Sequence, residues 1–238
     1  MSAGDAGAKP PLRVGAVLLA ADDSRRMGGI DKRRLELDGE PLVRRWLRLF
    51  REAGIGDVVV VLGHRADRIR PLVDGQGATV VTNPDHRRGQ QSSVLAGLAA
   101  LPAGIDAAMV ALVDLALVEA RDLRGLVDAF AARPAGTSAL VPFFRGRRGN
   151  PVIVSAGIVA RVLAQAAAAA PAPAQPAPGL GGDDAAGGLR GHLQAHPEEV
   201  FRHEAGNDHF TVDLDTVEDI ERLERRLGRP IGRPRDED

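Results

Sequence analysis

Cysteine is absent from this chain of 238 residues, and lysine is nearly absent. Without cysteine the protein can form no disulfide, no thiolate nucleophile and no cysteine-ligated metal centre. Lys9 and Lys32 are the two lysines, against an abundance of arginine. Lysine is rare in this chain, and one of its two lysines, Lys32, lies in a polar loop. We therefore expect this position to have a specific role.

A strong net charge and a long apolar run are missing too. The formal net charge is −1, so the chain has no general basic field that would attract nucleic acid. No segment reaches the length of a transmembrane helix without a charge or a proline, and residues 1–13 lack the apolar core of a signal peptide. The expectation is therefore a cytoplasmic protein with no nucleic-acid partner and no membrane association.

Short apolar runs alternate with segments of helical periodicity. The first run, 14–21, reads as a buried strand, and further strands are predicted at 57–62, 78–82, 107–113 and 138–144. Helices are predicted between them. This βαβ alternation predicts an α/β fold with a three-layer, Rossmann-like, mostly parallel sheet.

One globular domain is the default for this length and composition. It is expected to span residues 13–228, between a disordered N-terminus, 1–12, and a disordered tail, 229–238. Residues 164–188 form a low-complexity insertion of alanine, proline and glycine. Such a segment buries little apolar surface, so we expect a flexible or extended surface loop there.

The strand at 14–21 runs into a polar, glycine-containing loop that ends at Lys32. In an open α/β sheet, ligands bind at the carboxyl ends of the strands. The loop offers backbone N–H groups, the Ser24 hydroxyl and the charges of Arg26 and Lys32, and this mixture suits a polyphosphate. We therefore interpret the loop, which contains Gly28, as a polyphosphate-binding loop rather than a chance turn.

The strand at 107–113 delivers Asp114 to the same edge of the sheet. A carboxylate at the end of a central parallel strand can hold Mg²⁺ against phosphate oxygens, because hard cations prefer oxygen ligands. Near the C-terminus, residues 211–215 read as a short strand. Alternation would place Asp213 and Asp215 on one side of that strand, so that both can face one site.

His192 and His196 have the spacing of residues on one face of a helix. A zinc site is conceivable there, since imidazole is a common zinc ligand. The sequence offers no cysteine and no clear third ligand, so a solvent-exposed helix face is the favoured interpretation.

Several segments resemble the nucleotidyltransferases of the molybdenum cofactor, among them residues 114–118, which are similar to a D-x-P-L-V motif, and 213–219, which are similar to a D-x-D-T-P-E-D ending. The first loop is similar to their signature L-A-[AG]-G-x-S-x-R-M-G-x-x-K at Leu19, Ala20, Ala21, Ser24, Arg26, Met27, Gly28 and Lys32. Residues 83–98 resemble an N-P-x-x-x-x-G run followed by a serine and G-L, with Ser93 and Gly97 in register. Ser92 or Ser93 is also a candidate N-cap of the helix there. Residues 149–151 resemble a G-N-P segment that contains Asn150.

This resemblance implies the fold of the nucleotide-diphospho-sugar transferases and a Mg²⁺-dependent nucleotidyl transfer. The phosphate of molybdopterin would attack the α-phosphorus of CTP or GTP, and pyrophosphate would leave. The family motifs imply catalytic roles for Arg26, Lys32 and Asp114, and a metal held by Asp114 and Asp213, with Asp215 in reserve. The residues implied to bind substrates are Ala20, Ala21, Ser24, Gly28, Ser93, Gly97 and Asn150. The implied partners are the nucleotide, a molybdopterin-type cofactor and a molybdoenzyme.

The chain departs from the family pattern at several positions, and two of these departures leave other functions open. Asp22 stands where the family has glycine, and its charge would repel the same phosphates, while Ala116 replaces a proline. These changes would suit an NAD(P)H-dependent enzyme similar to nicotine blue oxidoreductase, or a non-catalytic maturation factor that holds the pterin cofactor. The base is open as well, because Ala20 and Ala21 resemble the cytidylyl branch whereas 29–32 resemble the guanylyl branch.

Overall fold

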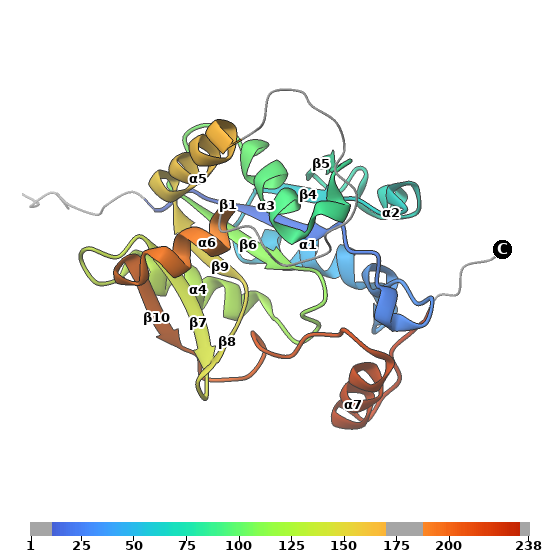
Figure 1. Cartoon of the computed structure of the whole chain (residues 1–238). Coiled ribbons are helices and arrows are strands. Elements are labelled where there is room, and N and C mark those ends of the chain that lie inside the picture. Colours follow the sequence, from blue (N-terminus) through green and yellow to red (C-terminus); the bar gives the residue numbers. More distant parts are fainter. Residues whose placement is uncertain (1–10, 170–187, 234–238) are drawn as a thin grey trace, which may run out of the picture.

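The computed structural model describes residues 11–169 and 188–233. Its centre is an eight-stranded sheet with the order β10-β7-β9-β6-β1-β4-β5, in which β8 pairs with β7 (Figure 1). Every pairing in this sheet is parallel except those made by β8 and β9. Its strands are β1 (Val14–Ala20), β4 (Asp57–Leu62), β5 (Thr79–Thr82), β6 (Ala107–Leu112), β7 (Ala139–Phe144), β8 (Arg147–Arg148), β9 (Val152–Ser155) and β10 (Val200–Glu204). A separate hairpin consists of β2 (Glu36–Leu37) and β3 (Glu40–Pro41).

Helices cover both faces of the sheet. Successive residues of β1 point to opposite faces, so that Leu18 packs in one core with α1, α2 and α4, and Val17 in a second core with α3, α5 and α6. The three-layer, mostly parallel fold predicted from the sequence is therefore confirmed. The helices are α1 (Leu42–Glu52), α2 (Ala66–Val73), α3 (Gln90–Ala99), α4 (Ala120–Ala131), α5 (Ala156–Ala169), α6 (Gly188–Ala195) and α7 (Val217–Leu227). Short 3₁₀ turns are η1 (Arg25–Met27), η2 (Lys32–Arg34), η3 (His86–Arg88) and η4 (Pro197–Glu199). In the described parts of the chain, no helix combines the length and the apolar character needed to cross a membrane.

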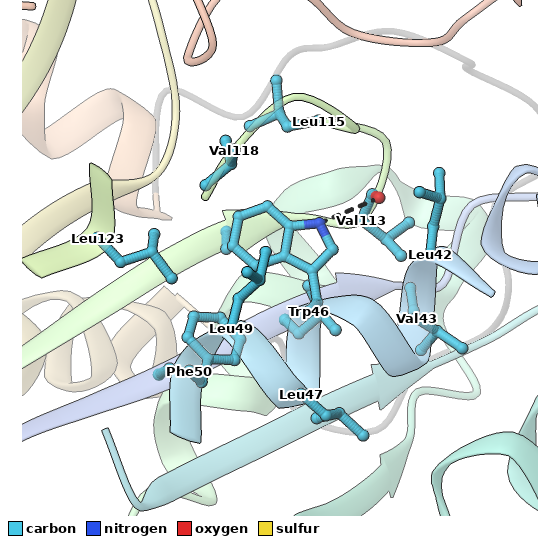
Figure 2. Close-up of a cluster of buried hydrophobic side chains, with 14 of the residues drawn as sticks. Leu42, Val43, Trp46, Leu47, Leu49, Phe50, Val113, Leu115, Val118 and Leu123 are labelled. Atoms are coloured by element: carbon cyan, nitrogen blue, oxygen red, sulfur yellow. Dashed lines mark hydrogen bonds between the residues drawn. The ribbon is translucent and has the colours of Figure 1, made fainter. Parts of the chain in front are cut away.

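A tryptophan on α1 connects the helix layer to the end of β6. Trp46 is buried among apolar side chains that include Phe50 and Leu123 (Figure 2). Its Nε1 donates a hydrogen bond to the carbonyl oxygen of Val113 at 3.2 Å. Because Val113 directly precedes Asp114, this bond fixes the backbone from which the Asp114 carboxylate projects.

The segment 211–215, predicted to be a strand, pairs with none of the described strands. It passes the end of β6, where the Leu214 N–H donates to the carbonyl oxygen of Asp114 at 3.2 Å. Leu214 is buried while Asp213 and Asp215 are not, which agrees with the predicted placement of the two aspartates on one side, but Thr211 is buried as well, so the alternation does not extend over the whole segment. The strand prediction was wrong because Thr216 begins a capping box for α7 directly afterwards, which leaves the segment too short to pair.

The prediction of a disordered tail was wrong for residues 229–233. Ile231 is buried, and Gly232 exchanges two backbone hydrogen bonds of 2.9 Å with Glu36. The end of the domain therefore closes over the β2–β3 hairpin. Residues 234–238, and residues 1–10 of the predicted disordered N-terminus, lie outside the described residues.

The prediction of a surface loop over 164–188 was wrong at both ends of that segment, which are helical. Helix α5 continues to Ala169, and α6 begins at Gly188. Alanine has the highest helix propensity, so the alanine run extends α5 before the first proline interrupts it. The remaining residues of this segment, 170–187, lie outside the described residues.

His192 and His196 do not form the solvent-exposed helix face that was expected. His192 is buried near the end of α6, and His196 lies directly after the last residue of that helix. The expectation was wrong because α6 packs against both α3 and α5, which leaves no free face at His192.

Gly97 lies where α3 packs closely against β1 and β4. A Cβ atom at this position would lie 2.3 Å from a methyl carbon of Val17 and 2.9 Å from one of Val61. Both valines are buried strand residues with little room to move. We therefore expect Gly97→Ala to lower the free energy of unfolding by roughly 1–3 kcal/mol, as measured by urea titration.

Gly125→Ala is the matched control for this substitution. Gly125 lies inside α4, and a Cβ atom there would meet nothing within 4 Å. Alanine is favoured over glycine in a helix, so this variant should be more stable by about 0.5–1 kcal/mol. Equal changes in the two variants would show that close helix–sheet packing is not what requires glycine at position 97.

Candidate active site

The carboxyl ends of β1 and β6 open into a cavity of about 620 Å³. Segments far apart in the sequence meet here: the first loop, the end of β6, the η3–α3 region and the segment before α7. Six of the predicted site residues line the cavity, namely Ala21, Arg26, Lys32, Ser93, Asp114 and Asp213. Asp215, the reserve metal ligand, lines it as well.

Lys32 lies at the centre of a group of aspartates. Its Nζ is 2.6 Å from Oδ2 of Asp114, 2.7 Å from Oδ2 of Asp22 and 3.3 Å from Oδ1 of Asp215. Lys32 is 4% exposed and Asp114 7%, whereas the Asp22 side chain is about half exposed. The lysine kept by the sequence is therefore a buried cation shared by three carboxylates.

Burial is the largest single influence on the pKa values of these groups. It favours the neutral amine of Lys32, but Asp114 and Asp22 together outweigh it and raise the pKa of Lys32. Burial also disfavours ionisation of Asp22, but its bond to Lys32 prevails and lowers the pKa of Asp22. The pKa of Asp114 is raised. Burial is the largest cause, repulsion from Asp215 and Asp213 acts in the same direction, and the attraction to Lys32 opposes them without prevailing. The amine thus stays charged while several carboxylates compete for it.

Negative charge exceeds positive charge around Lys32. Lys32 and Arg26 share this part of the cavity with the carboxylates of Asp22, Asp114, Asp213 and Asp215. Oδ1 of Asp114 is buried and has no hydrogen-bond partner among the described residues. A hard divalent cation fits such a donor set, because it prefers carboxylate oxygens and would balance the excess charge. Among the described residues, no three of these carboxylates have oxygens within 4.8 Å of one another, so their side chains would have to move to share one ion.

Arg33 holds the first loop against the sheet. Its side chain is 1% exposed, and its Nη1 donates to the carbonyl oxygens of Ala20 at 3.0 Å and His64 at 2.7 Å. Its Nη2 also pairs with Asp31 at 2.5 Å. These contacts fix the η2 turn, and hence Lys32, to the ends of β1 and β4. Arg33 was not predicted to be part of the site, because a Lys-Arg-Arg run does not reveal which arginine is buried.

Ser24 and Gly28 shape the loop without lining the main cavity. Both have left-handed backbone conformations, with φ of 52° at Ser24 and 60° at Gly28. The Ser24 hydroxyl oxygen accepts a hydrogen bond from the Lys32 N–H at 3.4 Å. The loop is therefore closed on itself around the short η1 turn.

Three other residues predicted to bind substrate lie outside the main cavity. Ala20 is fully buried beneath the loop, where its carbonyl oxygen accepts from Arg33. Gly97 packs against the sheet, as described above. Asn150 lines a neighbouring cavity. Their substrate contacts remain predictions.

Ser93 lies inside α3 rather than at its N-cap, which is Gly89. Its Oγ accepts a hydrogen bond of 3.0 Å from Nδ2 of Asn83. His86 also lines the cavity, and its Nδ1 donates to the carbonyl oxygen of Asn83 at 3.2 Å, so Nε2 is left as an acceptor. Within the described chain this buried Nε2 has no partner. His86 was not predicted to belong to the site, since a lone histidine among arginines carries no recognisable signal.

A smaller cavity of about 250 Å³ adjoins the first. The two cavities have four lining residues in common: Leu19, Gln90, Leu112 and Arg190. Asn150 and Arg148 line the smaller cavity, together with apolar side chains of α3, α6, β6 and β9. Burial and the nearby charge of Arg190 lower the pKa of Arg148. Neither guanidinium group has an acidic partner in the described parts of the chain, so an anionic ligand would be stabilised there.

The family model described as a MobA-like NTP transferase domain matches residues 16–175. The matched part contains both Lys32 and Asp114, the two residues joined by the 2.6 Å contact. The chain belongs to this family. The sequence motifs implied that this chain is an NTP transferase family member, and the match confirms it.

This MobA-like chain matches two curated relatives, one over a small part of the relative's length and the other over nearly all of it. The bifunctional IPC transferase and DIPP synthase of Rubrobacter xylanophilus is 38% identical over 102 residues, which are 41% of this chain and 23% of that protein. The chain therefore spans less than a quarter of that relative's length. The nicotine blue oxidoreductase of Paenarthrobacter nicotinovorans is 31% identical over 215 residues, which are 88% of this chain and 96% of that protein.

The fold of the MobA-like chain is also seen in solved structures. The crystal structure of Rv0371c from Mycobacterium tuberculosis H37Rv has a TM-score of 0.69 and 22% identity, and the match covers 90% of this chain and 99% of that one. A complex of Rv0371c with manganese matches with a TM-score of 0.60 and 20% identity, over 89% of this chain and 97% of that one. At these identities the likeness concerns the fold, and it agrees with the predicted nucleotide-diphospho-sugar transferase type.

Proposed function

We propose that this protein transfers a nucleoside monophosphate from CTP, or from GTP, to the phosphate of a molybdopterin-type cofactor and releases pyrophosphate. The observation that carries the proposal is the buried ammonium group of Lys32, held beside Asp114 in a cavity of about 620 Å³ at the carboxyl edge of the sheet. Membership of the MobA-like NTP transferase family supports it. CTP is the nucleotide we expect, because Ala21 belongs to the motif that resembles the cytidylyl branch.

The triphosphate would bind at the first loop. Lys32 and Arg26 would contact the phosphates that leave as pyrophosphate, and Arg87 lines the same cavity. Asp22 is half exposed, so it can turn toward solvent when a phosphate takes its place beside Lys32. No covalent nucleophile is needed, since this kind of transfer depends on in-line positioning and on cations that stabilise the developing charge.

Asp114 and Asp213, with Asp215 in reserve, would hold the divalent cation. The unpartnered Oδ1 of Asp114 and the excess of carboxylates support this assignment. A bound Mg²⁺ would neutralise phosphate charge and polarise the α-phosphate. The manganese complex of Rv0371c is a further reason to expect a divalent cation here.

The acceptor would occupy the smaller cavity. Arg148 and Arg190 offer two cations without acidic partners among the described residues, and Asn150 offers a polar side chain. The apolar residues around them suit the ring system of a pterin. The cavities adjoin, so a phosphate of the acceptor and the α-phosphate of the nucleotide can approach each other.

The test is incubation of the purified protein with each nucleoside triphosphate and Mg²⁺, with and without molybdopterin. Pyrophosphate release and mass spectrometry of the pterin product should show transfer with CTP or GTP when the acceptor is present. Tight pterin binding without any pyrophosphate would instead identify a non-catalytic maturation factor and reject the proposal.

A second candidate is an NAD(P)H-dependent oxidoreductase on the same scaffold. It is supported by the 31% identity to nicotine blue oxidoreductase, which extends over 96% of that protein. Oxidation of NAD(P)H with a quinonoid dye as acceptor, in the absence of any nucleoside triphosphate, would identify this activity. Transfer and oxidation are followed by different products, so each result stands by itself.

A further inference from the structure

A cluster of histidine and glutamate side chains, residue types that can ligate a metal ion, lies at the C-terminal end of α6. His192 is in the last turn of the helix, His196 follows it, and η4 carries Glu198 and Glu199. The rings of His192 and His196 are tilted by 37° to each other, with their centroids 4.6 Å apart. The chain thus brings the third and fourth ligands, which the sequence spacing did not indicate, next to the histidine pair.

The distances between these side chains are close to those within a metal site. His196 Nδ1 is 3.2 Å from Glu198 Oε1, and His192 Nε2 is 3.7 Å from Glu199 Oε2. Ligand atoms of His196, Glu198 and Glu199 all lie within 4.8 Å of one another. Two ligands of a tetrahedral zinc ion, each bonded at about 2.0 Å, are separated by roughly 3.3 Å. His192 is not part of this group of three, and its Nε2, 3.7 Å from Glu199 Oε2, would have to move closer to the other two side chains to become the fourth ligand.

We propose that His192, His196, Glu198 and Glu199 bind a Zn²⁺-class ion at a site separate from the nucleotide cavity. Two imidazoles and two carboxylates form a donor set that suits zinc better than magnesium, which prefers oxygen ligands and several waters. None of the four residues lines either cavity of the candidate active site. The proposal is thus independent of the reaction that the protein catalyses.

The charges around the cluster accommodate a divalent ion. Glu199 is paired with Arg161 of α5 at 2.5 Å, and Arg161 also lies 3.5 Å from His192 Nε2. The positive charge of Arg161 repels a cation at this position. The negative charges of two glutamates and the negative end of the α6 dipole together attract a cation more strongly than one guanidinium group repels it. Once an ion is bound, Arg161 can continue to hold Glu199 in place as an outer partner.

A zinc ion here would fasten the helix that serves the candidate active site. Helix α6 contributes Arg190 to both cavities from its first turn, and the four ligands lie at its other end. Binding would join α6 to η4 and to the start of β10. The expected consequence is a higher melting temperature of the protein with zinc than without it.

The experiment uses the whole protein, stripped of metal with a chelator and titrated with Zn²⁺ in competition with a chromogenic zinc indicator. Asp114→Asn removes the principal ligand of the nucleotide site, so zinc bound by that variant reports on the new site. In this background we expect one equivalent of zinc. Adding His196→Ala or Glu198→Gln should weaken that binding roughly tenfold or more and remove the rise in melting temperature.

His203→Ala in the same background is the matched control, because His203 lies on β10 outside the cluster. It should bind zinc like its parent. Glu198 is exposed, so Glu198→Gln is expected to fold even if a change at a histidine does not. Absence of a zinc equivalent in the Asp114→Asn protein, or unchanged affinity after Glu198→Gln, would overturn the proposal.

Discussion

Replacing Lys32 with methionine is expected to lower kcat/KM for nucleotidyl transfer about a hundredfold or more. The variant loses the buried ammonium group that would meet the leaving pyrophosphate. It also leaves the buried Asp114 carboxylate, now 2.6 Å from Lys32 Nζ, without its cation. The free energy of unfolding should therefore fall by about 3 kcal/mol. Initial rates of pyrophosphate release and urea titration measure the two effects.

The double variant Lys32→Met/Asp114→Asn separates stability from catalysis. Removing both charges avoids an isolated buried carboxylate, so most of the lost stability should return. The rate of transfer should not return and should be at least as low as in Lys32→Met, because neither the phosphate cation nor the principal metal ligand is present. A Lys32→Met enzyme that retains the wild-type rate would show that Lys32 does not act on the phosphates.

Replacing Asp22 with asparagine is expected to strengthen the binding of a nucleoside triphosphate about tenfold or more. The Asp22 carboxylate holds Lys32 at 2.7 Å and occupies the place that a phosphate would take. Asparagine keeps the shape of the side chain and removes its charge. Calorimetry with CTP and Mg²⁺, compared with the wild-type protein, measures the change in affinity.

Asp22→Gly is the second arm of this comparison, since glycine is the residue that the family motif has there. Asp22 is not among the residues with positive φ, so its backbone does not itself require glycine. The two variants should therefore bind the nucleotide alike. Weaker binding in both would contradict this explanation and make Asp22 a contributor to the site, through Lys32 or through the metal.

Much of the fold could be predicted from periodicity alone. The apolar runs that became β1, β4, β6 and β7 are continuous because both faces of the sheet are buried along most of their length, whereas the edge strand β5 is half-buried or exposed. The misses have particular causes. Strand β10 alternates weakly, since its residues are half-buried or exposed at the edge of the sheet. The packing of Ile231 and Gly232 against the β2–β3 hairpin depends on contacts nearly 200 residues apart, which local pattern cannot reveal.

The candidate site was predictable where a motif and a strand end coincide. Lys32, Arg26 and Asp114 were found because the loop after β1 and the end of β6 must meet at one edge of a parallel sheet. The partners of those residues were not predictable. The curled path of the loop pairs Asp22 with Lys32 and buries the side chain of Arg33. The spacing of residues in the sequence does not encode that path.

Calorimetric titration with CTP and with GTP in the presence of Mg²⁺ tests the central claim most directly. The claim is that the cations at the carboxyl edge of the sheet, together with a divalent ion, still bind a nucleoside triphosphate despite Asp22. The prediction is saturable heat for at least one nucleotide with the wild-type protein and its loss in the folded Lys32→Met/Asp114→Asn protein. No heat for either nucleotide at millimolar concentration would contradict the claim.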